Sequence, residues 1–272
     1  MLSVAFVARS VDPDFAEALR WHLAPFRRPD SDSNSFSIDL VHSEEDDATY
    51  SLLMGETAIY RSHRLGDVLG YALWAIHDMA PRRDEEHVLL HAGAVAREGQ
   101  VLLLPARMES GKSSLVLALL EHGFSYLSDE VGALDPASAR AYPFPKRITL
   151  DQEALRFFPG LEDRLSDRSG LSRLLPQRFA RPEDVGAKVG QPGAVRWLVF
   201  PSDDWGGPAR LSPFGRAEAV EAMAANCFNL YRHQDRGVLL LARIAKEAEP
   251  FRLDGGSPRE RAALIAERLL PR

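Results

Sequence analysis

Four consecutive residues near the middle of the chain, Gly111-Lys112-Ser113-Ser114, have the types and order of a phosphate-binding loop. They follow an apolar segment that ends at Leu104 and predicts a strand, and they open a segment of helical apolar spacing over 115–120. Backbone N–H groups at the start of a helix lack internal partners, and the helix dipole adds positive potential there. We therefore expect Lys112 to reach the terminal phosphates of a nucleotide and the Ser113 hydroxyl to ligate Mg²⁺.

The loop departs from the usual G-x-x-x-x-G-K-[ST] pattern at two positions. Ala106 takes the place of the first glycine, and Glu109 takes a place often held by another glycine and brings negative charge close to the phosphates. Gly111 alone remains to supply unusual backbone angles. The competing explanation is a chance Gly-Lys-Ser-Ser at a helix start. The predicted phosphate-binding residues are Ala106, Arg107, Met108, Glu109, Ser110, Gly111, Lys112, Ser113 and Ser114.

A pair of acids, Asp129-Glu130, follows the next predicted strand. The helix is expected to run from Lys112 to about Glu121, with Gly123 ending it in a left-handed conformation, and residues 124–127 to return as a strand. A strand–helix–strand unit almost always crosses over right-handed and makes its two strands parallel. This topology brings both acids to the sheet edge that carries the phosphate loop, where ligands bind in open α/β sheets.

A carboxylate at that edge has two chemical roles open to it. Asp129 can accept a proton from a substrate hydroxyl, or it can hold Mg²⁺ together with Ser113. The alternative for Asp129-Glu130 is a solvated acidic turn. We predict a metal site at Ser113 and Asp129.

Three further segments give weaker signals. Lys146 and Arg147 follow a stiff Pro143-Phe-Pro turn and can clamp phosphate or an acidic substrate, although a solvated loop is the default expectation. Arg196 opens a predicted buried strand and is a candidate for stabilising transition-state charge. The Asp203-Asp204-Trp205-Gly-Gly segment is predicted to be an exposed turn.

Two histidines, His87 and His91, have the H-x-x-x-H spacing that would bind zinc on a helix. The intervening Val-Leu-Leu predicts a strand instead, in which the two side chains lie about 13 Å apart. A shared metal is therefore not expected. For His91 alone, a structural role in the strand and an active-site role both stay open.

Composition limits the classes of function. The 272 residues carry a net charge of −6, which argues against a nucleic-acid-binding protein. The single cysteine, Cys227, excludes an internal disulfide and a cysteine zinc site, and it fits a reducing cytoplasm. The first residues do not resemble a signal peptide, and no apolar run is long enough to predict a membrane span. We expect a cytoplasmic protein.

Periodicity predicts a small N-terminal α/β part. Its expected elements are strands over 2–8, 35–41 and 57–60, a helix capped by Asp12 or Asp14, a loop over 28–34 and a helix over 65–79. The charged, proline-bearing segment 81–86 is predicted to be a junction. The predicted domains are therefore 1–84 and 85–272.

The second domain is predicted to begin with a hairpin, whose strands over 87–96 and 100–104 are joined by a turn at 97–99. A buried strand over 195–200, a helix over 217–228 and a closing helix over 258–270 are also expected. Residues 238–242 fit either a short strand or a helical segment.

Three segments of this domain resemble the catalytic domain of HPr kinase/phosphorylase. They are His91-Ala-Gly-Ala-Val-Ala, the Gly-Lys-Ser-Ser loop, and Gly123-Phe-Ser-Tyr-Leu-Ser-Asp-Glu. The chain looks closer still to the HPr kinase-related proteins of bacterial gene clusters, including the kinases that phosphorylate lasso peptides. The resemblance covers roughly residues 85–150, and it extends more weakly through Tyr142-Pro-Phe-Pro-Lys-Arg-Ile-Thr-Leu and Asn226-Cys-Phe-Asn.

The resemblance implies an α/β fold of the P-loop type found in the C-terminal domain of HPr kinase and in phosphoenolpyruvate carboxykinase. It implies ATP and Mg²⁺ as cofactors, and phosphorylation of a serine hydroxyl on a peptide or protein. HPr kinase itself is hexameric, so a homo-oligomer is one option. The first 80 residues do not obviously resemble the regulatory domain of HPr kinase, so HPr as substrate is not implied.

By position, the resemblance gives Lys112 and Ser113 the phosphate and metal roles. Asp129 takes the place of the first acid of the family's Asp-Asp pair, the base, and Glu130 replaces the second. His91 matches a histidine near the family's active site. The predicted catalytic residues are thus Asp129, Glu130, Lys112 and His91. Two rival functions stay open: a catalytically weak nucleotide-binding regulatory or scaffold protein, and a simple ATPase or small-molecule kinase.

Overall fold

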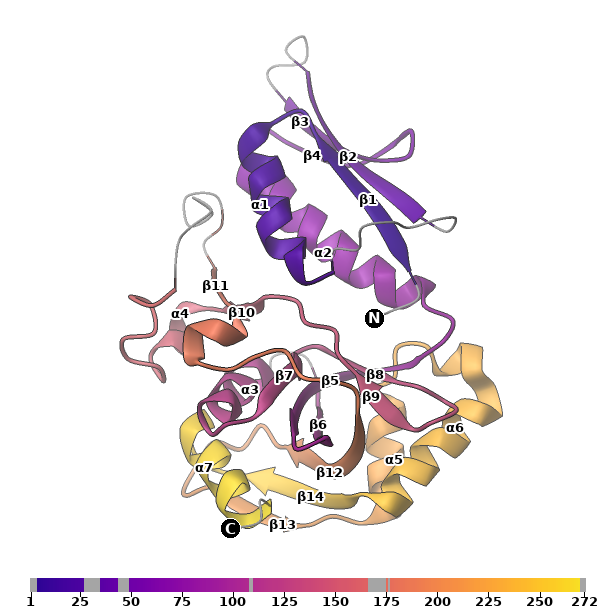
Figure 1. Cartoon of the computed structure of the whole chain (residues 1–272), viewed down its shortest axis with the longest axis vertical. Coiled ribbons are helices and arrows are strands. Elements are labelled where there is room, and N and C mark those ends of the chain that lie inside the picture. The colour runs from indigo at the N-terminus through magenta and orange to yellow at the C-terminus, as the bar shows by residue number, and fades with distance from the viewer. Residues whose placement is uncertain are drawn as a thin grey trace. The chain divides into compact units, whose positions relative to one another are not determined.

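The chain is a mixed α/β protein, seen in a computed structural model that describes residues 4–26, 35–43, 49–107, 110–165, 175 and 177–269 (Figure 1). It divides into two compact units. The larger unit comprises Glu85–Leu165 and Phe179–Arg272, and the smaller comprises Ser3–Asp84 and Ser166–Arg178. Each unit is described by itself below.

The smaller unit is a four-stranded sheet with the order β1-β2-β3-β4, against which two helices pack. Strand β1 is parallel to β2, and the other neighbours are antiparallel. The elements are β1 (Ala5–Ser10), α1 (Pro13–Leu23), a 3-10 turn (Ala24–Phe26), β2 (Ser35–Ser43), β3 (Thr49–Met54), β4 (Thr57–Ser62) and α2 (Leu65–Arg83).

Local signals explain most of these elements. Asp12 is the residue that caps α1, because its Oδ1 accepts a 2.9 Å hydrogen bond from the backbone N–H of Phe15. Strand β3 was not predicted, and the loop expected over 28–34 lies outside the described residues. The junction expected over 81–86 begins later than predicted, since α2 continues through the buried Pro81 to Arg83.

The larger unit is built around an eight-stranded sheet with the order β13-β14-β12-β6-β5-β8-β9, in which β7 also pairs with β5 and β9 also pairs with β12. Its strands are β5 (Val88–Arg97), β6 (Gln100–Pro105), β7 (Ser125–Ser128), β8 (Val131–Leu134), β9 (Arg140–Tyr142), β12 (Gly193–Pro201), β13 (Arg210–Pro213) and β14 (Glu249–Asp254). Its main helices are α3 (Lys112–Glu121), α5 (Arg216–Ala225), α6 (Leu230–Glu247) and α7 (Pro258–Leu269).

Smaller elements complete the unit. They are β10 (Ile148–Leu150), which pairs with β11 (Arg178–Ala180), a short helix α4 (Gln152–Leu155) and a 3-10 turn over Pro182–Val185. Residues 238–242 are helical, as part of α6, so the strand alternative is wrong. The helix predicted over 217–228 ends at Ala225, and the closing helix is present as α7.

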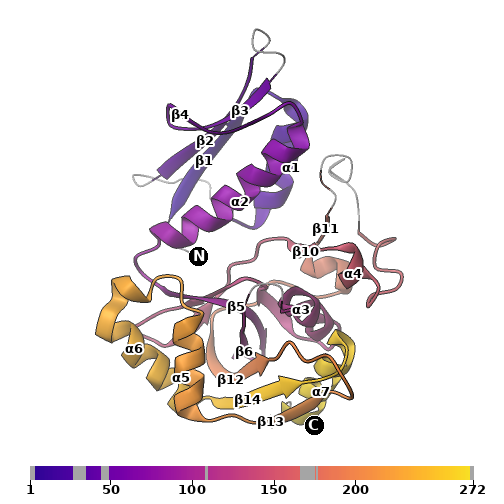
Figure 2. The same ribbon diagram turned by 180° about the vertical axis from the view of Figure 1, so that it is seen from behind.

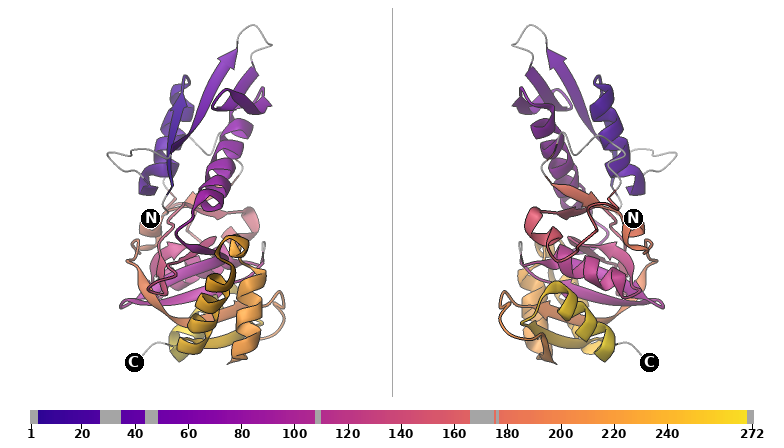
Figure 3. Two further views of the ribbon diagram at one scale, coloured as in Figure 1. Left: turned by 90° about the vertical axis from the view of Figure 1, so that its right-hand side faces the viewer. Right: turned by 90° about the vertical axis from the view of Figure 1, so that its left-hand side faces the viewer.

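The sheet of the larger unit is covered on both faces, with α3 and α7 on one side and α5 and α6 on the other (Figures 1, 2 and 3). Strand β6 shows the alternation that this requires. Leu102 and Leu104 belong to the core under α3 and α7, whereas Val101 and Leu103 belong to the core under α5 and α6. This is why the strand is apolar at every position from Val101 to Leu104.

The β5–β6 hairpin confirms the predicted turn. Glu98 and Gly99 have φ angles of 52° and 77°, the left-handed pair that suits the twist of a two-residue hairpin. The strands on either side of α3 run in the predicted relative direction. Both β6 and β7 are antiparallel to β5, so they are parallel to each other. The difference is that β5 lies between them. The ends of β6 and β7 nevertheless point to one edge of the sheet.

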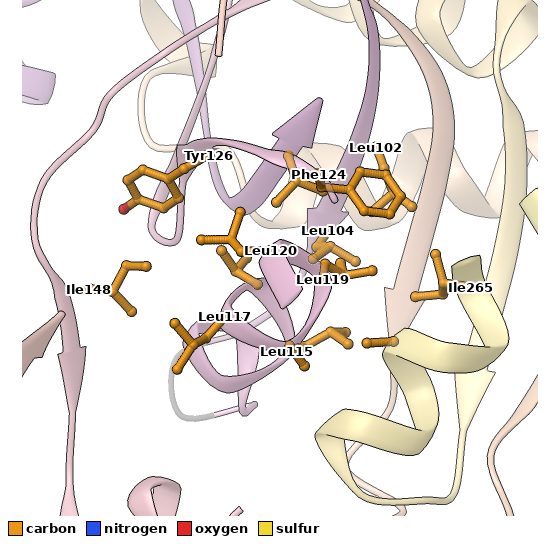
Figure 4. Packing of buried hydrophobic residues seen from close by; sticks show 14 of the residues in the cluster. Leu102, Leu104, Leu115, Leu117, Leu119, Leu120, Phe124, Tyr126, Ile148 and Ile265 are labelled. Carbon is orange, nitrogen blue, oxygen red and sulfur yellow. The ribbon is translucent and has the colours of Figure 1, made fainter. Parts of the chain in front are cut away.

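Helix α3 is buried on nearly all sides, with every residue from Ser114 to Leu120 inside the unit. Leu115 and Leu119 point toward Ile265 of α7, and Leu117 and Leu120 point toward Tyr126 and Ile148 (Figure 4). Packing of this kind fixes the axis of α3, and with it the position of the loop at its N-terminus.

Candidate functional site

The predicted phosphate loop joins the end of β6 at Pro105 to the start of α3 at Lys112. Met108 and Glu109 lie outside the described residues, so the effect of the Glu109 charge stays a prediction. Gly111 precedes the helix with φ 75° and ψ 16°, a left-handed conformation that favours glycine. Ser114 is buried in the first turn of the helix, while Arg107 is exposed.

Lys112 closes the loop onto its own beginning. Its side chain is buried, and Nζ donates to the carbonyl oxygens of Ala106 (3.0 Å) and Arg107 and to Oγ of Ser110 (3.3 Å). Burial lowers the pKa of this amine to about 8, against the opposing effect of Asp129, Glu130 and Asp203. The ammonium charge is therefore held at the loop with little solvation of its own.

Ser113 connects the loop to the acidic turn. Its Oγ donates a 2.7 Å hydrogen bond to Oδ2 of Asp129, a residue that is only 2% exposed. The turn itself is set by the buried Ser128, whose Oγ accepts from the backbone N–H groups of Glu130 (3.1 Å) and Val131 (2.9 Å). Asp129 is thus a buried, oriented carboxylate at the loop, and a solvated acidic turn is the wrong description of it.

Tyr126 supports Asp129 from the strand below. Its hydroxyl lies 2.9 Å from Oδ1 of Asp129 and 2.9 Å from the carbonyl oxygen of Lys146, and it donates toward both. Burial, followed by the Asp129 charge, raises the pKa of this phenol well above its ordinary value. Tyr126 therefore remains a hydrogen-bond donor across the physiological pH range. In the sequence, Tyr126 is one residue of a predicted strand, and no local pattern marks it as part of a site.

Lys146 is the residue for which the default expectation was wrong. It is 6% exposed, and Nζ lies 3.1 Å from Oδ1 of Asp129 and 3.3 Å from Oε2 of Glu130. Burial acts to lower its pKa, but the charges of Asp129 and Glu130 outweigh burial and raise it. Lys146 is therefore a charged partner of the acidic turn.

The chain around Lys146 explains how it arrives there. The backbone N–H of Phe144 donates to the carbonyl oxygen of Leu127 (2.9 Å), and the Phe144 side chain is buried. The segment that the sequence marked by Pro143-Phe-Pro is therefore anchored beside the end of β7. This anchoring delivers the next lysine to Asp129.

Glu130 and His91 are the two remaining predicted catalytic residues. The Glu130 side chain is 44% exposed and reaches Lys146, while its carbonyl oxygen accepts from the backbone N–H of Ala92 (3.0 Å). His91 lies on β5, and its carbonyl oxygen accepts from the backbone N–H of Ala106 (3.3 Å) at the start of the loop. The backbone thus places His91 between the loop and the acidic turn.

The imidazole of His91 is neutral at physiological pH. Burial lowers its pKa to about 4; the Lys112 and Lys146 charges act in the same direction, and the Asp129 charge opposes them. Its ring lies 5.7 Å from that of the partly exposed Phe228. The His87 ring instead lies 5.4 Å from Tyr142. Within the described ranges no group of three or more His, Cys, Asp or Glu side chains is arranged to hold a metal.

Arg196 and the 203–207 segment lie at different distances from the phosphate loop. Arg196 is at the bulge near the start of β12, where it pairs with Glu249 of β14 (2.6 Å). Since β12 is parallel to β6 and the loop follows the far end of β6, Arg196 is at the opposite end of the sheet from the loop. The 203–207 segment is exposed as predicted, but its Trp205 contacts Gly111 of the loop.

No protein-family model matches this chain, and no curated protein matches it at a significant level of similarity. Among the described helices, none combines the length and apolar character needed to cross a membrane.

Proposed function

We propose that the chain is an ATP-dependent kinase related to HPr kinase, with the P-loop fold that this family shares with phosphoenolpyruvate carboxykinase. It transfers the γ-phosphoryl group of ATP to a serine hydroxyl of a peptide or protein in the cytoplasm. The observation that carries the proposal is the 2.7 Å hydrogen bond between Ser113 and Asp129. It joins a Gly-Lys-Ser loop at a helix N-terminus to a buried carboxylate, the two parts that phosphoryl transfer to a hydroxyl requires.

The donor set fits a magnesium ion. Mg²⁺ is bound through one or two protein oxygens and otherwise by water and substrate phosphates, so the adjoining oxygens of Ser113 and Asp129 suffice for the protein share. When bound, the ion would offset negative charge on the phosphate oxygens. The N–H groups of the first turn of α3, which have no acceptor within the helix, and the Lys112 ammonium supply the remaining positive potential.

The residues of the acidic turn then divide the chemistry. Asp129 accepts the proton of the acceptor hydroxyl, and the oxygen of that hydroxyl bonds to the γ-phosphorus. The bond between the γ-phosphorus and the oxygen that bridges it to the β-phosphate breaks, and ADP leaves. Lys146 and Tyr126 orient the carboxylate. His91, being neutral, can hydrogen-bond the acceptor without adding charge.

The test is transfer of labelled phosphate from [γ-³²P]ATP·Mg²⁺ to a degenerate library of serine-containing peptides. Replacing Asp129 with Asn is expected to lower transfer by at least about a hundredfold, since a positioned base contributes that much or more. Nucleotide affinity, measured by calorimetry, is expected to stay nearly unchanged, because the asparagine amide keeps an oxygen for the ion and the loop still holds the phosphates. Glu221→Gln, which removes an exposed acid on α5, is the matched control. Undiminished transfer by Asp129→Asn refutes the assignment of the base.

A second candidate is a nucleotide-binding regulatory or scaffold protein without turnover. The observation that favours it is the saturation of Asp129, which already contacts Ser113, Tyr126 and Lys146. Both of its carboxylate oxygens therefore already accept hydrogen bonds from the chain itself, which leaves less access for the hydroxyl of a phosphoryl acceptor. ATP binding without transfer to any peptide supports this candidate, whereas absence of ATP binding excludes both functions.

A further inference from the structure

Trp205 lies directly against the phosphate loop. A Cβ atom placed on Gly111 would come within 2.5 Å of Cη2 and 2.7 Å of Cζ2 of the Trp205 indole. The edge of the six-membered ring is therefore in contact with Gly111, the residue that precedes α3. A second sign of closeness is that the charge of Asp203, in the same turn, acts on Lys112.

Arg261 of α7 holds the indole in place. Its guanidinium carbon lies 3.9 Å from the centre of a Trp205 ring, which is a close cation–π stack. The same guanidinium donates to the carbonyl oxygens of Gly255 (2.7 Å), Asp204 (2.7 Å) and Ser202 (3.2 Å). Arg261 is 1% exposed, so a buried cation connects the indole to the backbone carbonyl groups of the turn.

Two glycines lock the backbone of the turn from below. Gly255 and Gly256 have φ angles of 64° and 71°, and a Cβ on Gly255 would lie 2.4 Å from the carbonyl oxygen of Pro208. Their N–H groups donate to the carbonyl oxygens of Asp204 (2.8 Å) and Gly207 (3.0 Å). The backbone of the turn is therefore held by hydrogen bonds and close packing, although its residues are exposed.

The indole of Trp205 is supported by its neighbours but is not covered by them. Trp205 keeps 40% of its surface in contact with solvent, although one ring face stacks on Arg261 and one edge contacts Gly111. An aromatic surface that is held fixed and left open is the arrangement used to stack a nucleobase. In a nucleoside triphosphate, one ribose and one phosphate separate the base from the β-phosphate. The Trp205 indole, which contacts Gly111, therefore lies within reach of the base of a nucleotide whose phosphates are bound at the loop.

We propose that the exposed surface of Trp205 stacks the base of the nucleotide whose phosphates are held by the loop. This inference rests on the proposed function, because it assumes that the loop binds a nucleoside triphosphate. Stacking uses the face that every base possesses, so ATP and GTP are expected to bind with similar affinity.

The experiment compares two probes, ATP and inorganic tripolyphosphate, each with Mg²⁺, by calorimetry on the whole chain. Trp205→Ala is expected to weaken ATP binding by about tenfold to hundredfold, the usual effect of removing one stacking partner, and to leave tripolyphosphate binding unchanged. Trp205→Phe keeps an aromatic face and is expected to retain most of the affinity. Trp74→Ala, which removes an exposed tryptophan of the smaller unit, is the matched control.

The outcomes distinguish a failure of the Trp205 stacking proposal from a failure of the proposed function. Equal losses for ATP and tripolyphosphate in Trp205→Ala would mean that the indole only supports the loop, and would overturn the stacking proposal. An unchanged ATP affinity with a raised KM for a peptide acceptor would overturn it in favour of acceptor docking. If the wild-type chain binds neither probe, the proposed function fails first and the base site fails with it.

Discussion

Replacing Lys146 with methionine tests whether the acidic turn is a buried charge cluster. Methionine keeps the length and apolar volume of the side chain and removes the ammonium group. The side chains of Lys146 and Asp129 are 7% and 1% exposed, and their charged atoms are 3.1 Å apart. The change therefore leaves a buried carboxylate without its cation.

The size of the effect depends on which of the two ion pairs of Lys146 dominates. The pair with Glu130, whose side chain is 44% exposed, is screened by water and contributes at most about 1 kcal/mol. The pair with Asp129 is of the buried class, in which removal of one partner costs about 3–5 kcal/mol. We therefore expect Lys146→Met to lower the free energy of unfolding by about 3–5 kcal/mol, which corresponds to roughly 6–20 °C in Tm.

The expected loss has a defined pH range. The pKa of Lys146 is raised in the folded protein, so its contribution is fully present below its ordinary pKa and is lost only as pH rises above that value. The difference between wild type and Lys146→Met is therefore expected to be constant between about pH 6 and pH 9.

Urea unfolding followed by circular dichroism measures this difference. Lys188→Met, at an exposed position of the same unit, is the control and is expected to change stability by no more than about 0.5 kcal/mol. The double variant Lys146→Met/Asp129→Asn removes both charges and is expected to recover part of the loss. A loss below about 1 kcal/mol in Lys146→Met, or no recovery in the double variant, would show that Lys146 is solvated and that this account of the site is wrong.

Two further predictions concern the loop itself. The pKa of Lys112 is about 8, and phosphate favours the charged amine, so ATP affinity is expected to fall by up to about tenfold between pH 8 and pH 9. Calorimetry across this range checks it, and a flat profile would contradict a role for Lys112 in phosphate binding. Gly111→Ala forces a side chain into a left-handed conformation and against Trp205, so we expect a loss of about 1–2 kcal/mol from backbone strain, with further loss from the clash. Thermal unfolding and ATP titration measure it, and Trp205→Ala in the same chain should restore only the part due to the clash.

The sequence was sufficient to predict the parts of the site that depend on local order. The apolar strand, the Gly-Lys-Ser motif and the helix with left-handed Gly123 are signals carried by neighbouring residues. The position of Asp129 followed from a general rule on crossover direction, and it did not require knowledge of which strands pair. This is why the prediction of a shared edge held even though β5 lies between β6 and β7.

The residues that were missed depend on contacts between distant segments. Lys146 looks like a solvated cation in sequence, because nothing near it reveals that Phe144 is anchored to Leu127. Trp205 lies in a run of turn residues, and both its contact with Gly111 and its stack on Arg261 join segments that are far apart in the sequence. Periodicity describes which face of an element is apolar, but it does not report which polar residues meet across the fold.

The burial of α3 on nearly all sides determines how its amide protons should exchange with solvent. A helix enclosed by the sheet, by α7 and by Tyr126 and Ile148 has no route to open by itself, so its amides exchange only when the whole unit unfolds. The loop before it is joined to that helix at one end and is held by the Lys112 side chain across its mouth. Slow exchange in α3 beside faster exchange at Ala106 and Ser110 would mark Gly111 as the boundary between the part of the site that opens only on global unfolding and the part that opens locally.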